Sequence, residues 1–227
     1  MSTSHDRTPR PATARHVLFD VDGTLIDALA NQRRMWAQWA RRHDLDPATV
    51  YEVALRTRPV DTFAVVAPDL DPADGLALLH ELEDADVRHG KYAAFAGADE
   101  LLRELPLGAW ALVTSNYEHR VRGRFARTGL PVPAVIVDAA AAEHGKPAPD
   151  PYLLAARLLG TTPERCLVIE DSPSGVEAGL RAGMTVWSVN AAASVTGAHR
   201  HFPILADAAR DIVEWVGSGA TGRDAKL

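Results

Sequence analysis

Five short runs of apolar residues, each followed by polar or small residues, divide most of the chain. They span 16–21, 109–115, 134–138, 166–171 and 185–190. Their apolar character is continuous, which is typical of strands in a parallel sheet that is covered on both faces. Helix-like segments precede the last four runs, over 99–104, 117–127, 151–159 and 174–182. The alternation of strands and helices predicts a doubly wound α/β fold.

The stretch 28–92 interrupts this alternation directly after the first strand. It contains no convincing strand, and its apolar residues recur at helical spacing, as in Trp36, Trp39 and Ala40. This spacing predicts a small helical cap inserted into a catalytic core made of 16–27 and 93–216. The simpler interpretation of the individual tryptophans and leucines is ordinary helix packing. A cap in this position would close over a site at the strand ends.

The two ends of the sequence lack the apolar pattern. Residues 1–15 are polar and proline-rich, so we expect a disordered leader that is neither a signal peptide nor a membrane span. Residues 217–227 are polar and glycine-containing, and we expect a flexible tail. No run approaches the roughly 18 consecutive apolar residues of a transmembrane helix, so no membrane association is expected.

Charge and cysteine content narrow the possible partners. The formal net charge is -6 and the 24 lysines and arginines are scattered, which argues against a nucleic-acid partner. An anionic substrate would need a locally positive site, made by a metal ion or by a few placed cations. The single cysteine, Cys166, excludes an intrachain disulfide, and a reducing cytoplasm is the simplest location. A monomer or a homodimer is expected.

A pair of aspartates follows the first predicted strand. The sequence 20–24 reads Asp-Val-Asp-Gly-Thr, and carboxylates at i and i+2 would point to one side if strand geometry continued. Gly23 would let the chain turn sharply behind them. This arrangement suits a nucleophile beside an acid or base. Because aspartate and glycine are also common in turns, the motif alone leaves a purely structural turn open.

Three further polar segments follow later strands or loops. They are Thr114-Ser115-Asn116, Gly145-Lys146-Pro147 and Glu170-Asp171-Ser172. Together with 20–27, and in this order, they resemble the four signatures of the haloacid dehalogenase superfamily. The resemblance spans about residues 17–190. It implies a Rossmann-like core and a Mg²⁺-dependent phosphatase that acts on a small phosphorylated metabolite.

The resemblance also implies a metal site and a mechanism. Mg²⁺ would be held by Asp20, Asp171 and the backbone carbonyl of Asp22, with Glu170 nearby; oxygen ligands of this kind are those that Mg²⁺ prefers. Asp20 would attack phosphorus to form a phospho-aspartate. Asp22 would first act as an acid toward the leaving group and then as a base toward water. Without the other signatures, Glu170 and Asp171 would be interpreted as an acidic pair facing solvent.

The remaining signatures imply the groups that bind the phosphoryl moiety. Lys146 would hold the phosphate and offset the negative charge of Asp20. Thr114 would donate a hydrogen bond to the phosphoryl oxygens, together with backbone amides near Ser115 and Asn116. An aspartate at position 22 is typical of the members that act on phosphate esters rather than on carbon-halogen bonds.

The cap resembles that of the β-phosphoglucomutase-like subgroup, which includes phosphatases of sugar, polyol and glycerol phosphates. The segment 57–62 is similar to a cap segment of several of those enzymes, although Arg56-Thr57 replaces a frequent His-Gly pair. We therefore expect Arg58 to face the substrate. A phosphosugar mutase would use the same core residues, and a noncatalytic protein that binds a phosphorylated metabolite is a third possibility. Retention of both Asp20 and Asp22 favours an enzyme.

Overall fold

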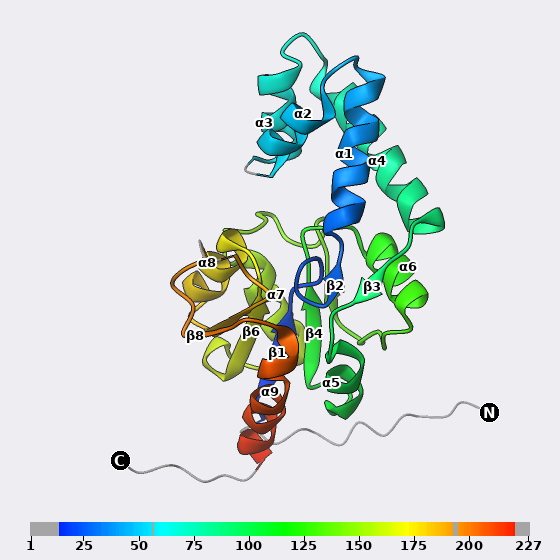
Figure 1. Cartoon of the computed structure of the whole chain (residues 1–227). Helices are drawn as coiled ribbons and strands as arrows, with labels where there is room; N and C mark the ends of the chain where they lie inside the picture. The colour runs from blue at the N-terminus through cyan, green and yellow to red at the C-terminus, as the bar shows by residue number, and fades with distance from the viewer. Residues whose placement is uncertain (1–13, 56, 193–194, 221–227) are drawn as a thin grey trace, which may run out of the picture.

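The computed structural model of the chain describes residues 14–55, 57–192 and 195–220 (Figure 1). Most of the predicted leader and the end of the predicted tail, 221–227, lie outside the described residues. The described part of the chain contains no helix that is long and apolar enough to cross a membrane.

The core is a parallel sheet of six strands, in the order β5-β4-β1-β6-β7-β8. The strands are β1 (His16–Phe19), β4 (Trp110–Val113), β5 (Ile136–Val137), β6 (Cys166–Glu170), β7 (Thr185–Val189) and β8 (Arg200–Phe202). All five predicted runs form strands, so the predicted α/β fold with a parallel sheet is confirmed. Strand β8 was not predicted; two of its three residues are exposed.

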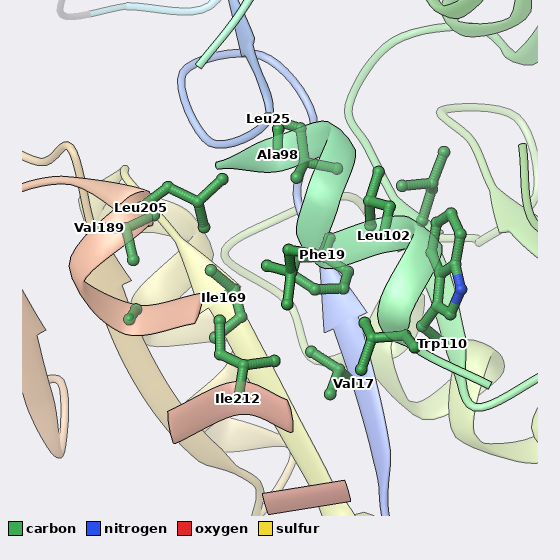
Figure 2. Close-up of a cluster of buried hydrophobic side chains, with 14 of the residues drawn as sticks. Val17, Phe19, Leu25, Ala98, Leu102, Trp110, Ile169, Val189, Leu205 and Ile212 are labelled. Carbon is green, nitrogen blue, oxygen red and sulfur yellow. The ribbon is translucent and has the colours of Figure 1, made fainter. Parts of the chain in front are cut away.

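Helices cover both faces of this sheet, which explains the continuous apolar runs. They are α5 (Ala98–Glu104), α6 (Glu118–Thr128), α7 (Asp150–Leu159), α8 (Pro173–Arg181) and α9 (Leu205–Ala220), with a short 3₁₀ turn at Pro163–Arg165. Figure 2 shows Val17 and Phe19 of β1 in the cluster that also contains Leu102 and Ile212. Leu18, between them, belongs to the opposite cluster with residues of α7 and α8.

The helical insert forms a separate bundle above the carboxyl end of the sheet (Figure 1). It comprises α1 (Leu29–Arg42), α2 (Pro47–Ala54), α3 (Pro59–Val66) and α4 (Pro72–His89). The chain leaves the core through β2 (Ile26–Asp27) and returns through β3 (Ala93–Ala94), and these two strands pair antiparallel. The predicted cap inserted after the first strand is thus confirmed as part of the fold.

The cap has its own apolar core, centred on Trp39. The Trp39 ring stacks on Phe63 with centroids 4.8 Å apart, and its Nε1 donates to the backbone oxygen of Gly75 at 3.0 Å. The N-termini of α2 and α4 are fixed by Asp46 and Asp71, whose side chains accept backbone hydrogen bonds. Each of these caps precedes a proline at the first helical position. The cap is therefore a packed unit and not a loose loop.

The carboxyl-terminal boundary differs from the expectation. Helix α9 continues to Ala220, so the predicted tail boundary at residue 217 falls too early. Buried residues of α9, including Leu205, Ala208 and Ile212, pack into the same cluster as β1. The helix was not predicted because its apolar residues alternate with polar ones at helical spacing and form no continuous run like those of the strands.

Candidate active site

The site lies at the carboxyl ends of three neighbouring strands. Asp20 directly follows β1, Thr114 follows β4, and Glu170 is the last residue of β6. Because β1 lies between β4 and β6 in the sheet, these ends meet at one edge. A cavity of about 940 Å³ opens there, lined by core residues and by residues of the cap helices α1 and α4.

Lys146 is the cation at the floor of this cavity. Its Nζ lies 2.7 Å from Oδ1 of Asp20, 2.6 Å from Oε1 of Glu170 and 3.0 Å from the backbone oxygen of Val113. Burial opposes the charge on Lys146, but the adjacent carboxylates of Asp20 and Glu170 outweigh it and raise the pKa of the ammonium well above its ordinary value. Lys146 is therefore a fixed positive charge beside Asp20.

Glu170 is fully buried beneath the cavity and accepts hydrogen bonds from several residues of the site. In addition to Lys146, its Oε1 accepts a hydrogen bond from the Tyr152 hydroxyl at 3.0 Å. Its Oε2 accepts from the backbone nitrogens of Asp171 and Ser172, and from Oγ of Ser172. With both oxygens engaged, Glu170 positions Lys146 and the 171–172 turn and has little capacity left for a metal ion.

Two glycines let the acidic groups approach the backbone. A Cβ on Gly23, which has φ +99°, would lie 2.0 Å from Oδ2 of Asp171. A Cβ on Gly175, in the first turn of α8, would lie 1.7 Å from Oε1 of Glu170. Neither position can accept a larger residue without displacement of a site carboxylate.

Two of three clustered carboxylates, those of Asp20 and Asp171, could hold a divalent cation. One oxygen atom each of Asp20, Glu170 and Asp171 lies within 4.8 Å of the others, but both oxygens of Glu170 already accept hydrogen bonds. Oδ2 of Asp171 has no hydrogen-bond partner among the described residues, whereas its Oδ1 accepts from Thr24 at 3.2 Å. An all-oxygen donor set of this kind fits Mg²⁺.

The electrostatics of the cluster favour a cation as well. Burial and the neighbouring carboxylates of Glu170 and Asp171 raise the pKa of Asp20 well above its ordinary value, although Lys146 lowers it. Burial, together with Glu170, raises the pKa of Asp171 to about 7. Among the described residues, Lys146 is the one cation that pairs with this cluster, and it contacts Asp20 and Glu170 but not Asp171. The excess negative charge is what a bound divalent ion would neutralise.

Asp22 lies apart from the cluster and has different partners. Its Oδ2 accepts a hydrogen bond from Nη1 of Arg124, a buried residue of α6, and a second one from Nδ2 of Asn116 at 3.3 Å. Asp22 lines the cavity, and its Oδ1 has no hydrogen-bond partner among the described residues. Asp20 and Asp22, which are two residues apart in the sequence, therefore have side chains in different environments.

The segment 114–116 lines the same cavity. Thr114 is buried, Ser115 is exposed, and Oγ1 of Thr114 accepts a hydrogen bond from the backbone nitrogen of Asn116 at 3.1 Å. The side chain of Asn116 thus binds Asp22, a contact that the sequence did not predict. The roles of all three residues toward a phosphoryl group remain predictions.

Arg58 is not brought to the site. It precedes α3, its side chain is 85% exposed, and its Nε pairs with Oδ2 of Asp61 at 2.8 Å. The cavity lining includes the neighbouring Leu55 and Pro59 but not Arg58. In this arrangement Arg58 binds the first turn of its own helix, so the geometry gives no support to the expected substrate contact.

The cap contributes other residues that the sequence analysis did not identify. His80 and Glu83 of α4 line the cavity, opposite Tyr117 and Arg120 of the core. Arg120 is buried; its guanidinium pairs with Glu83 and, at 2.6 Å, with Asp84. These contacts join α4 to α6. The acidic residues and the arginine were visible in the sequence, but their pairing across 36 and 37 residues was not.

The fold and the site define a class of α/β enzyme with a buried carboxylate, a lysine and an acidic cluster at the strand ends beneath a helical cap. A family model described as a haloacid dehalogenase-like hydrolase matches residues 14–183. This match covers more than half of the 227 residues. The chain belongs to the haloacid dehalogenase-like hydrolase family.

Similar proteins include both phosphatases and a mutase. Hexitol phosphatase A of Escherichia coli is 41% identical over 179 residues, which cover 78% of this chain and 83% of that protein. The beta-phosphoglucomutase of Mycobacterium bovis is 32% identical over 215 residues, covering 76% and 79%. A mutant of CbbY from Rhodobacter sphaeroides in complex with xylulose-(1,5)bisphosphate has a TM-score of 0.73 and 26% identity, covering 86% and 96%. These relatives support a phosphoric monoester hydrolase.

Proposed function

We propose that this protein is a Mg²⁺-dependent phosphatase that hydrolyses a small phosphomonoester through a phospho-aspartate on Asp20. The observation that carries the proposal is the arrangement around Asp20. One of its oxygens is held by Lys146 at 2.7 Å, and the other is free at the edge of a cavity that Asp22 also lines. Phosphoryl transfer depends mainly on positioning and on charge stabilisation, and this arrangement supplies both.

In the first step, the free oxygen of Asp20 attacks phosphorus while the bond from phosphorus to the ester oxygen breaks. The electron pair remains on the leaving oxygen, which takes a proton from Asp22 and departs as the alcohol. Lys146 offsets the repulsion between Asp20 and the phosphate. At about 4 Å and an effective dielectric of 20, each pair of like charges would otherwise cost about 4 kcal/mol.

In the second step, Asp22 accepts a proton from a water molecule as that water attacks the phosphorus of the phospho-aspartate. The bond between phosphorus and Asp20 breaks, inorganic phosphate is released, and Asp22 again carries the proton for the next cycle. Thr114 and the backbone near Ser115 and Asn116 bind the phosphoryl oxygens in both steps. The exchange of roles explains why the site needs two aspartates with different partners.

The residues that would hold Mg²⁺ are Asp20 and Asp171, with the backbone carbonyl of Asp22. When bound, the ion supplies positive charge that neutralises the carboxylates and the phosphate. Glu170 orients Lys146 and the 171–172 turn and does not bind the ion directly, since both of its oxygens already accept hydrogen bonds.

The proposed substrates are phosphates of sugars or polyols. The cavity has room for a ligand of this size, and the cap side of its lining offers polar groups from Gln32, His80 and Glu83. The similarity to hexitol phosphatase A, at 41% identity, favours a linear polyol phosphate among these candidates.

Cys166 is a buried free thiol, which agrees with the proposed cytoplasmic location.

A phosphosugar mutase is the second candidate, and the similarity to a beta-phosphoglucomutase keeps it in view. A mutase would transfer the phosphoryl group from Asp20 to a sugar instead of to water. The two activities therefore differ in the acceptor and share the first step.

The experiment is a phosphate-release assay with the purified full chain against hexitol, hexose, glycerol and nucleotide monophosphates, with Mg²⁺ and with EDTA. We expect Mg²⁺-dependent release that is highest for a polyol or sugar phosphate. The same preparations are tested for interconversion of glucose 1-phosphate and glucose 6-phosphate with a sugar bisphosphate primer. Isomer interconversion without phosphate release would show that the protein is a mutase and not a phosphatase. The absence of both activities would contradict both candidate functions.

A further inference from the structure

Arg124 is a buried arginine that touches the proposed acid-base residue. It lies in α6 and is 2% exposed, and its Nη1 donates a hydrogen bond to Oδ2 of Asp22. None of the four sequence motifs contains it. We propose that Arg124 is a positioning residue, which fixes the carboxylate of Asp22 in the orientation that proton transfer requires. This inference rests on the proposed phosphatase function.

The hydrogen bonds around Asp22 leave one oxygen available for chemistry. Arg124 and Asn116 both donate to Oδ2, whereas Oδ1 has no partner among the described residues. Asp22 lies beyond the end of β1, where its backbone forms an isolated bridge with Ile26, so the pairing of the main sheet does not fix its side chain. Two donors on one oxygen restrict the rotation of the carboxylate, and Oδ1, which is buried and has no partner among the described residues, is the oxygen left to carry the proton.

The surroundings of Arg124 are unusual for an arginine. Its neighbours on α6, Val121 and Phe125, belong to the apolar core, and its Nε has no hydrogen-bond partner among the described residues. Burial of a guanidinium is costly unless it is paired, and an apolar residue would often serve stability as well. Its ion-pair partner within the described chain is Asp22. The arginine at this position is therefore best explained by what it does to Asp22.

The Arg124 guanidinium also contacts the segment that connects α4 of the cap to β3. The ring of Tyr92, between α4 and β3, has its centroid 5.4 Å from the Arg124 guanidinium carbon. The Tyr92 hydroxyl donates to Oδ2 of Asp86, which also accepts from Asn31 of α1 at 2.6 Å. A rigid support of this kind is what a positioning residue needs.

The test compares two esters that differ in their need for an acid. The p-nitrophenolate leaving group departs without a proton, whereas the alkoxide of an alkyl phosphate needs one. For Arg124→Gln, we expect kcat on the best alkyl phosphate to fall by roughly 10²-fold, within the range of general acid-base contributions. Rapid mixing with p-nitrophenyl phosphate should give a fast burst of p-nitrophenolate followed by slow turnover, since only the second step then needs Asp22.

Three further variants complete the design. Arg122→Gln, an exposed arginine of the same helix that pairs with Glu118, should behave as wild type. Asp22→Asn should show the same dependence on the ester with a larger loss. Arg124→Lys keeps a positive donor and should recover part of the alkyl phosphate activity. If Arg124→Gln does not fold, the comparison of the two esters is made with Arg124→Lys instead.

The inference is overturned if Arg124→Gln hydrolyses both esters at the wild-type rate. It is also overturned if Arg124→Gln slows the first step equally on both esters and Arg124→Lys gives no recovery, because equal slowing indicates a merely structural role. A failure of the proposed function looks different. In that case the wild type itself would release no phosphate from either ester.

Discussion

At the scale of single residues, Glu170 holds the site together. It is fully buried at the end of β6, and it accepts hydrogen bonds from Lys146, Tyr152 and the 171–172 backbone. A buried carboxylate is tolerated only with such complete pairing. The same pairing fixes Lys146 against Asp20, so one residue serves both stability and the site.

We expect Glu170→Gln to lower the free energy of unfolding by about 3 kcal/mol, because the amide group leaves buried donors unpaired and removes a charge opposite Lys146. Urea unfolding monitored by circular dichroism measures this change. Glu177→Gln, which alters an exposed pair with Arg181 in α8, is the matched control and should stay within about 0.5 kcal/mol of wild type. Equal effects of the two variants would contradict the role given to Glu170.

The geometry gives a different expectation for Arg58 than the sequence did. Since its side chain is 85% exposed and paired with Asp61, we expect Arg58→Ala to leave KM for the best substrate nearly unchanged. Steady-state kinetics with the best ester from the substrate panel measures this. A clear rise in KM would show that the cap rearranges to bring Arg58 to the substrate, as the sequence analysis expected.

Part of this site could be predicted from the sequence, but the contacts that depend on how helices dock on the sheet could not. Asp20, Thr114 and Asp171 follow apolar runs, so their meeting at one edge of the sheet could be inferred from strand order. The pairing of Arg124 with Asp22 could not, because it depends on how α6 docks on the sheet. A signal was nevertheless present, since helical spacing from Val121 places Arg124 next to the buried face.

At the scale of elements, the contact of α8 with the end of β6 determines which residues can occupy position 175. Gly175 lies in the first turn of α8, and its backbone nitrogen donates to Oγ of Ser172 at 3.1 Å. There is no space for a Cβ, since Glu170 already fills it. The helix therefore begins against the carboxylate that it helps to enclose.

We expect Gly175→Ala to destabilise the protein by about 2 kcal/mol and to impair phosphate release, because the new methyl group displaces Glu170. Gly217→Ala, in α9, is the matched control: no atom lies within 4 Å of its added Cβ, and alanine should stabilise that helix by about 0.5–1 kcal/mol. Thermal unfolding and the phosphate assay compare the two variants. A stabilised and active Gly175→Ala protein would contradict the packing described here.

The strands that the sequence did not predict share a physical reason. Strands β2 and β3 have two residues each, and β8 has three, so their patterns are too short to be recognised. They form because of tertiary contacts, as in the pairing of Ile26 with Ala94. The five longer runs could be predicted because strands that are buried on both faces consist of continuous apolar residues.

At the scale of the whole molecule, an acidic protein must bind an anion. The chain has a net charge of -6, and three carboxylates converge beneath the cavity. In the proposed function, binding of the phosphate therefore depends on local positive charge, from Lys146 and from the proposed Mg²⁺. The cap completes the cavity and is attached to the core by the two short linkers and by the pairing of Arg120 with Glu83 and Asp84.

Mg²⁺ should stabilise the folded protein, because it relieves repulsion that exists only in the folded state. At a free concentration about 100 times its Kd, the expected gain is about 2.7 kcal/mol. Thermal unfolding with and without Mg²⁺ measures this gain. Asp171→Asn should abolish it, whereas Asp99→Asn, which alters an exposed pair with Arg103, should not. Equal stabilisation of both variants by Mg²⁺ would place the ion elsewhere.

The most direct test of the account is to capture the phosphoryl group on Asp20. Asp22→Asn is mixed with p-nitrophenyl phosphate and Mg²⁺, quenched in acid and digested, and the peptides are analysed by mass spectrometry beside wild type and Asp20→Asn. The account predicts that a phosphoryl group accumulates on Asp20 in the Asp22→Asn protein and is absent from Asp20→Asn. A phosphoryl group on another residue, or continued phosphate release by Asp20→Asn, would contradict it.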